Sequence, residues 1–190
     1  MLRLGVAFLA VVLVAGGCMG DDAATGYEEG DLPRMVLLAE DLEGRGWTRF
    51  DWGRQTRTDQ PTGPRSDPAR FGRVDGWKAR YRRLGSRQTS GPLVVESRAD
   101  VFEDAEGATT DFDEYGAELQ SAGTQLEEVP GLGDRAIIAT LTQGDVRFYL
   151  VMWRDENAVA AVNANGFDGK LTREQALELA RKQQERMDDA

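Results

Sequence analysis

The chain has 190 residues, of which 41% are hydrophobic and 29% charged, with 33 acidic side chains against 23 basic ones. This length and apolar content suffice for the packed core of about one domain. The absence of histidine and the presence of a single cysteine exclude imidazole-based catalysis, an internal disulfide and a cysteine zinc site, and we expect no cofactor.

The first 17 residues have the pattern of a secretory signal peptide. Arg3 is followed by residues 4–17, none of which carries a charge or a polar side chain. A membrane-spanning helix needs about 20 apolar residues, so this stretch is short for a permanent anchor. We therefore expect residues 1–17 to be a cleaved export signal.

The exit of this segment, Val14-Ala15-Gly16-Gly17-Cys18, resembles the lipobox of bacterial lipoproteins, although leucine is commoner than alanine at position 15. The resemblance implies signal cleavage after Gly17 and lipid attachment at Cys18, including acyl chains such as palmitate. The protein would then be anchored to the extracytoplasmic face of the cell membrane, within the cell envelope. The alternative is an ordinary secretory signal beside an unrelated cysteine. Residues 18–30 are polar and aperiodic, which predicts a lipidated, flexible tether before one domain at 31–190.

The beginning of the domain predicts a short helix and a long loop. Leucine and methionine side chains between Asp31 and Leu42 suggest a helix that opens at Pro33 and ends before Gly44. Residues 51–72 are interrupted repeatedly by glycine and proline, which predicts an irregular segment.

Two strands should follow. Residues 74–83 alternate between apolar and basic side chains, and residues 93–102 alternate between apolar and charged ones. If the two strands pair through the loop at 85–91, Glu96 and Asp100 would lie across from the basic side chains.

The second half predicts a helix, three strands and a last helix. Asp104 can cap a helix whose apolar stripe runs through Ala108, Phe112 and Tyr115. Strands are expected at about 134–141, 146–154 and 157–164, joined as hairpins. Thr172 and Gln175 have the spacing of a capping box at the start of the last helix. The fold class is thus α+β, a mostly antiparallel sheet of about five strands with two or three helices packed against it.

A second resemblance concerns the turn before the first of these three strands. Residues 129–136, Val-Pro-Gly-Leu-Gly-Asp-Arg-Ala, are similar to a strand entry of actinobacterial lipoproteins and kinase-linked extracellular sensor domains. The resemblance supports the extracytoplasmic compartment and the fold class, and it implies no active-site residues.

The search for catalytic and metal-binding patterns gives no candidate. No Ser-x-x-Lys or Gly-x-Ser-x-Gly pattern occurs. The acidic run at 111–116 resembles the opening of a calcium loop but has Tyr115 and Ala122 where oxygen ligands belong, so we interpret it as part of a helix. The sequence therefore indicates a protein that is not an enzyme; a carboxylate-dependent hydrolase is the less favoured alternative.

Basic residues are concentrated in one segment, since residues 45–87 contain twelve basic and four acidic side chains. This segment is either a surface that binds an envelope protein or an anionic envelope polymer, or a face that acidic neighbours neutralise. The candidate binding residues are Trp77, Lys78, Arg80, Tyr81 and Arg82. Nucleic acid is not expected as a partner, because the protein is acidic overall. We expect a lipid-anchored extracytoplasmic binding domain of unknown specific role; the alternative is a small-molecule or lipid carrier with an apolar pocket.

Overall fold

A computed structural model describes residues 26–55 and 65–190. The signal peptide, Gly17, Cys18 and most of the expected tether lie outside the described residues. Within them, seven antiparallel strands form one sheet in the order β1-β2-β3-β7-β6-β5-β4. The strands are β1 (Thr48–Gln55), β2 (Arg73–Arg82), β3 (Val94–Phe102), β4 (Gln125–Glu128), β5 (Arg135–Gln143), β6 (Val146–Asp155) and β7 (Ala158–Phe167).

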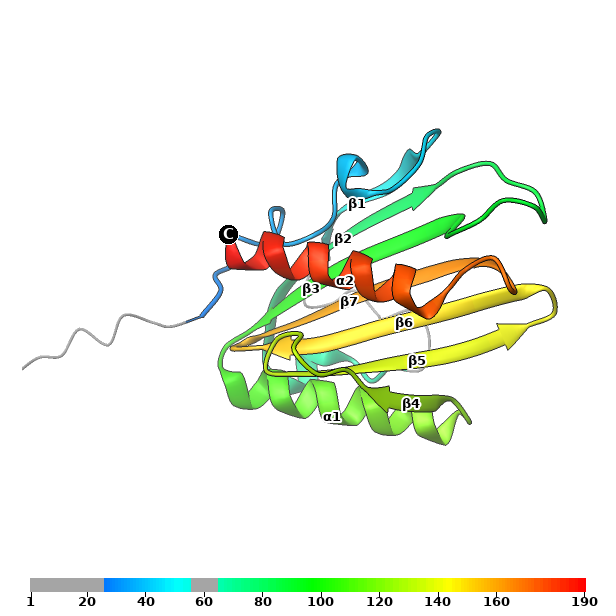
Figure 1. The fold of residues 1–190 in the computed structure, drawn as a ribbon. Helices are drawn as coiled ribbons and strands as arrows, with labels where there is room; N and C mark the ends of the chain where they lie inside the picture. Colours follow the sequence, from blue (N-terminus) through cyan, green and yellow to red (C-terminus); the bar gives the residue numbers. More distant parts are fainter. Residues whose placement is uncertain (1–25, 56–64) are drawn as a thin grey trace, which may run out of the picture.

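Two α-helices cover the two faces of the sheet (Figure 1). Helix α2 (Arg173–Asp188) crosses one face, called here the α2 face, and helix α1 (Ala105–Ser121) lies on the other, the α1 face. Two short 3-10 helices, η1 (Ala39–Asp41) and η2 (Pro68–Phe71), complete the described elements. The architecture confirms the α+β class and the antiparallel sheet.

The alternation of each central strand supplies both apolar cores. On β7, Ala160 and Val162 are buried with the residues under α2, whereas Val159 and Ala161 are buried with Phe112 of α1. Because successive side chains point to opposite faces, a strand covered on both sides must be apolar throughout.

The predicted helix starts at Asp104 and Thr172 are confirmed. The Asp104 side chain accepts a hydrogen bond from the backbone N–H of Gly107 at 2.8 Å, which caps α1. Thr172 and Gln175 form the capping box of α2. The acidic run at 111–116 lies within α1, as the interpretation as a helix requires.

The expected number of strands was wrong, because both edge strands were missed. Strand β1 lies in a segment that was expected to be irregular from residue 51 onward, and β4 is only four residues long. The side chains of β1 are half-buried or exposed, so they lack the strong apolar alternation of an inner strand.

The expected helix within residues 31–42 was also wrong, because the segment forms turns and η1 instead. Met35, Val36 and Leu37 are buried one after another, a pattern that no helix lying on a surface produces. The backbone of Leu37 bonds to the sheet: its N–H donates to Ser97 Oγ at 2.9 Å and its carbonyl accepts from the Tyr81 hydroxyl at 3.0 Å. The segment therefore packs as part of the core on the α2 face.

No helix in the part of the chain that the structure describes is long and apolar enough to cross a membrane.

Candidate functional site

The α1 face of β2 carries the three basic side chains of the predicted strand, Lys78, Arg80 and Arg82, which we call the basic ladder. Lys78 lies 2.9 Å from a carboxylate oxygen of Asp51 on β1, and Arg80 Nε lies 3.0 Å from Glu96 on β3. The expected position of Glu96 opposite the ladder is thus confirmed. The ladder is partly neutralised, and Arg82 remains exposed at its end.

The five candidate binding residues are divided between the two faces of the sheet. Tyr81 is 1% exposed, and its hydroxyl is bonded to the backbone of Leu37, so this side chain belongs to the core on the α2 face. Trp77 packs edge-to-face against Trp52 at 5.7 Å between ring centroids. Only the basic ladder faces the opposite side, so the five residues do not form one surface. Whether the ladder binds a partner stays a prediction.

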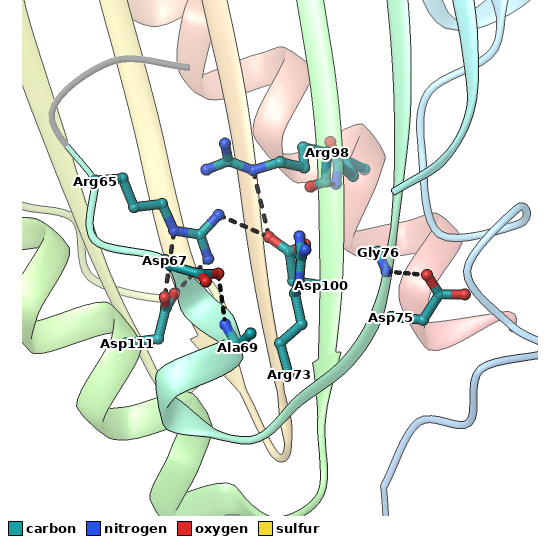
Figure 2. Close-up of polar contacts among 10 residues, drawn as sticks. Arg65, Asp67, Ala69, Arg73, Asp75, Gly76, Arg98, Asp100 and Asp111 are labelled. Atoms are coloured by element: carbon teal, nitrogen blue, oxygen red, sulfur yellow. Dashed lines mark hydrogen bonds and ion pairs between the residues drawn. The ribbon is translucent and has the colours of Figure 1, made fainter. Parts of the chain in front are cut away.

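Further along the α1 face, charged side chains are buried together under η2 and α1 (Figure 2). Arg65 donates to Asp111 of α1 through both Nε, at 3.2 Å, and Nη2, at 2.5 Å. Its Nη1 donates to Asp100 of β3 at 2.8 Å. Asp100 also accepts from Arg73 at 3.1 Å and lies 3.5 Å from Nε of Arg98. This buried ion cluster contains three arginines and two aspartates.

The position opposite Asp100 makes room for its carboxylate. Asp100 was expected to lie across from the basic ladder, but its partner in β2 is Gly76. A Cβ atom at position 76 would collide with the Asp100 carboxylate. Glycine at this position therefore allows the carboxylate to stay within the sheet and bind arginines on the α1 face.

The two carboxylates of the cluster are affected differently by burial. Burial alone would raise the pKa of Asp100, but Arg65, Arg98 and Arg73 outweigh it and hold the pKa below its usual range. For Asp111 the effect of burial prevails over the attraction of Arg65, and its pKa is raised. A buried carboxylate keeps its charge only where enough cations compensate for lost hydration, and Asp100 has three arginines where Asp111 has one close partner.

Arg98 is the arginine of the cluster with the weakest bonding. Its side chain is 8% exposed, yet the contact with Asp100 uses only Nε, and that atom makes no hydrogen bond by strict geometry. Figure 2 shows the two terminal nitrogens directed away from Asp100, and no hydrogen bond or ion pair is formed by them with any described residue. The guanidinium group lies 5.7 Å from the ring centroid of Tyr115.

A pocket of about 270 Å³ lies beside this guanidinium group, and we call it the Arg98 pocket. It is bordered both by the basic ladder, through Arg80, and by the buried ion cluster, through Arg98. Its lining residues are Arg80, Glu96, Arg98, Tyr115, Leu150, Ala161 and Asn163.

A second side chain that lines this pocket has a buried polar atom without a hydrogen bond. The Oδ1 atom of Asn163 on β7 is buried and accepts no hydrogen bond. Asn163 pairs with Glu96 across the β3–β7 ladder, and Arg98 pairs with Ala161, so the asparagine is a diagonal neighbour of the arginine on the same face. A buried acceptor and a buried cation without full bonding are costly in a folded protein, and their common position in one pocket is typical of a ligand site.

The two carboxylates of the buried ion cluster are ion-pair partners. Asp100 and Asp111 are both bonded to Arg65, which leaves neither of them as a free general acid or base. No group of three carboxylate, histidine or cysteine side chains among residues 26–55 and 65–190 is arranged to hold a metal ion.

A second pocket, of about 260 Å³, lies between α2 and the hairpin of β2 and β3, with Trp47 and Arg83 among its lining residues. The Arg83 guanidinium is stacked over Trp47 at 5.1 Å and donates to the carbonyl groups of Pro92 and Ser90. This arginine is bonded through Nε and Nη2, and none of the described residues that line the pocket has a buried side-chain polar atom without a hydrogen bond, in contrast to the Arg98 pocket.

Arg65, Arg73, Arg98 and Asn163 were not found from the sequence. One signal was available: Asp111 lies three residues after Ala108 and four before Tyr115, within the apolar stripe of α1. A carboxylate at such a position will be buried and requires a cation. Which arginine supplies it could not be read from the pattern, because Arg65 is 46 residues away in the chain.

No family model matches the chain, and no match was found among curated proteins. Among solved structures, the fold is similar to that of the extracellular domain of PknH from Mycobacterium tuberculosis, with a TM-score of 0.64. The match covers 87% of this chain and 98% of that domain, at 13% sequence identity. The predicted resemblance to kinase-linked extracellular domains is therefore confirmed at the level of the fold.

Proposed function

We propose that this protein is a lipid-anchored, extracytoplasmic binding domain without catalytic activity. The acylated Cys18, exposed after cleavage at Gly17, would hold the protein on the outer face of the cell membrane. The partner would be an envelope protein or an anionic envelope polymer that contacts the basic ladder.

One observation carries the proposal: the half-buried Arg80 and the exposed Arg82 of the basic ladder lie beside a polar pocket on the same face of the sheet. Arg80 borders the Arg98 pocket, and Arg82 is exposed two residues further along β2. The similarity in fold to the extracellular domain of a kinase supports the compartment. The absence of an available nucleophile or free carboxylate pair at the pocket favours binding over catalysis.

The test is co-sedimentation of the full chain, purified in detergent, with an isolated bacterial cell-wall fraction that retains its proteins and anionic polymers. Arg80→Glu and Arg82→Glu together should reduce binding at least tenfold, because the reversal replaces attraction by repulsion. The matched control reverses two exposed arginines elsewhere, Arg34 and Arg181. Equal binding by the ladder variant and the wild type, with both folded, would refute the contact surface.

The lipid anchor is tested separately. In a host that processes lipoproteins, Cys18→Ala should abolish incorporation of labelled palmitate and move the protein from the membrane fraction to the soluble exported fraction. Palmitate labelling that survives this substitution would contradict the assignment of Cys18.

A further inference from the structure

We propose that the Arg98 pocket binds a small molecule with a carboxylate or phosphate group and a neighbouring hydroxyl or amine donor. The proposal rests on the proposed binding function and names the ligand class of its central pocket. The oxyanion would be held by the terminal nitrogens of Arg98, and the donor by Asn163 Oδ1.

The charges around Arg98 favour an anion. Asp100 is shared by three arginines, and its two shorter contacts, at 2.8 and 3.1 Å, go to Arg65 and Arg73. The 3.5 Å contact with Arg98 is made by Nε, so its two terminal nitrogens are left for another partner. A guanidinium group offers its terminal nitrogens as a planar pair of donors, which matches the two oxygens of a carboxylate or phosphate.

The burial of Arg98 shows that its position is fixed. Its side chain is 8% exposed, and it lies between Asp100 on one side and the Tyr115 ring on the other. An arginine that only improved solubility would extend into water, whereas this one is held at the wall of a pocket. The low-dielectric surroundings strengthen its attraction for an anion compared with an exposed arginine.

The Asn163 side chain indicates the second polar group of the ligand, which is a hydrogen-bond donor. An orphan acceptor needs an N–H or O–H donor, and a bare anion has none to offer. As diagonal neighbours on adjacent strands, Arg98 and Asn163 have backbones about 7–8 Å apart. Since Oδ1 is buried, the Asn163 amide would turn toward the pocket to accept from a donor next to the anionic group. Leu150 and Ala161 provide apolar contact between the two polar positions.

The experiment measures binding by two-dimensional NMR titration of the full chain in detergent, with three probes: inorganic phosphate, lactate and propionate. Lactate and propionate share a carboxylate, but only lactate has the neighbouring hydroxyl group. We expect saturable shifts of pocket resonances with lactate and at least fivefold weaker binding of propionate. Tighter binding of inorganic phosphate than of lactate would indicate a ligand with a phosphate group, and the reverse order would indicate a carboxylate.

Substitutions in the pocket test what each side chain contributes to binding of the probes. Arg98→Gln should weaken every probe at least tenfold, and Asn163→Leu should remove the difference between lactate and propionate. Arg98→Lys, which keeps the positive charge but loses the planar pair of terminal nitrogens, keeps the test open if Arg98→Gln does not fold, and it should also weaken every probe. Arg181→Gln, on the exposed side of α2 and outside the pocket, is the matched control and should change nothing.

The proposal is overturned if none of the probes gives saturable shifts, or if a folded Arg98→Gln variant binds as the wild type does. It is likewise overturned if propionate binds as tightly as lactate. These outcomes are distinct from failure of the proposed function, because cell-wall binding through Arg80 and Arg82 is measured independently. Loss of wall binding on reversal of the ladder, together with no binding of any probe, would refute the pocket ligand alone.

Discussion

At the scale of single residues, Asp100 decides whether the α1 face can contain so many buried charges. It is completely buried and is in contact with Arg65, Arg73 and Arg98. Each of these guanidinium groups would be costly to bury alone, and the carboxylate offsets that cost for all three. The 3.5 Å contact of Arg98 is made by its Nε, and the terminal nitrogens are directed away from Asp100 (Figure 2).

Asp100→Asn should therefore destabilise the protein by about 3–5 kcal/mol, the range for breaking a buried ion pair by removing one partner. The amide keeps the size of the side chain but leaves three buried cations with a single carboxylate, Asp111. The measurement is the free energy of unfolding in urea. As a control, Asp168→Asn alters an exposed ion pair with Arg147 and should change stability little. A loss below about 1 kcal/mol for Asp100→Asn would show that the cluster does not depend on this charge.

The part of the site that the sequence predicts is the part whose residues follow a local pattern within one strand. The basic ladder was found because its members alternate within a single strand, a local pattern that sequence displays directly. Arg98 and Asp100 also alternate within β3, but their burial depends on η2 and α1 covering that end of the strand. Such coverage is a property of the tertiary fold, so the difference between the exposed Arg82 and the buried Arg98 could not be read from either strand.

At the scale of elements, β3 connects the two layers of the molecule. On its α2 face, the Ser97 hydroxyl donates to the side-chain oxygen of Gln183 at 2.6 Å and accepts from the N–H of Leu37. The Gln183 amide then donates to the carbonyl of Arg98 at 2.9 Å. A buried polar network thus attaches α2 and the N-terminal segment to the strand whose opposite face lines the pocket. Leu177 and Met187 of α2 are buried on the same side of the sheet.

Gln183→Leu should cost about 1–3 kcal/mol, because it leaves the Ser97 hydroxyl and one backbone carbonyl buried without this partner. Leucine has a similar volume, so the loss reports hydrogen bonding more than packing. The free energy of unfolding measures it, with Gln120→Leu on the exposed side of α1 as the matched control, expected within about 0.5 kcal/mol of the wild type. Adding Ser97→Ala to Gln183→Leu should lower stability further, because the buried N–H of Leu37 then loses its acceptor; equal stability of all variants would contradict the network.

The elements that were missed share a physical cause. Inner strands and amphipathic helices bury side chains at regular intervals, so their pattern is visible in the sequence. Strands β1 and β4 are at the edges of the sheet, where one side lacks a neighbouring strand and burial is incomplete. Residues 31–42 are the opposite case, since several consecutive residues are buried without any regular element. Their bonds to Ser97 and Tyr81 exist only after the sheet has formed.

At the scale of the whole molecule, the described N-terminal residues are part of the folded domain. Tyr27 donates its hydroxyl to Asp155 at 2.6 Å, and its backbone N–H donates to the Asn157 side chain at 2.8 Å, which attaches this segment to the turn between β6 and β7. Further along the segment, Leu32 and Met35 are fully buried on the α2 face. The ordered contacts therefore begin before residue 31, the expected start of the domain.

A chain that begins at residue 43 should consequently lose cooperative folding, whereas one that begins at residue 26 should keep it. Removing residues 26–42 uncovers apolar strand surface and takes away four fully buried aliphatic side chains: Leu32, Met35, Val36 and Leu37. Each contributes about 1.5–3 kcal/mol by its burial, and together they approach the total stability of an ordinary domain, about 5–15 kcal/mol. Thermal unfolding followed by near-ultraviolet circular dichroism compares the two chains. A sharp transition at the same Tm in both chains would show that residues 26–42 contribute little to the stability of the domain. Loss of the sharp transition in the shorter chain alone would establish the segment as part of the core that supports β2 and β3.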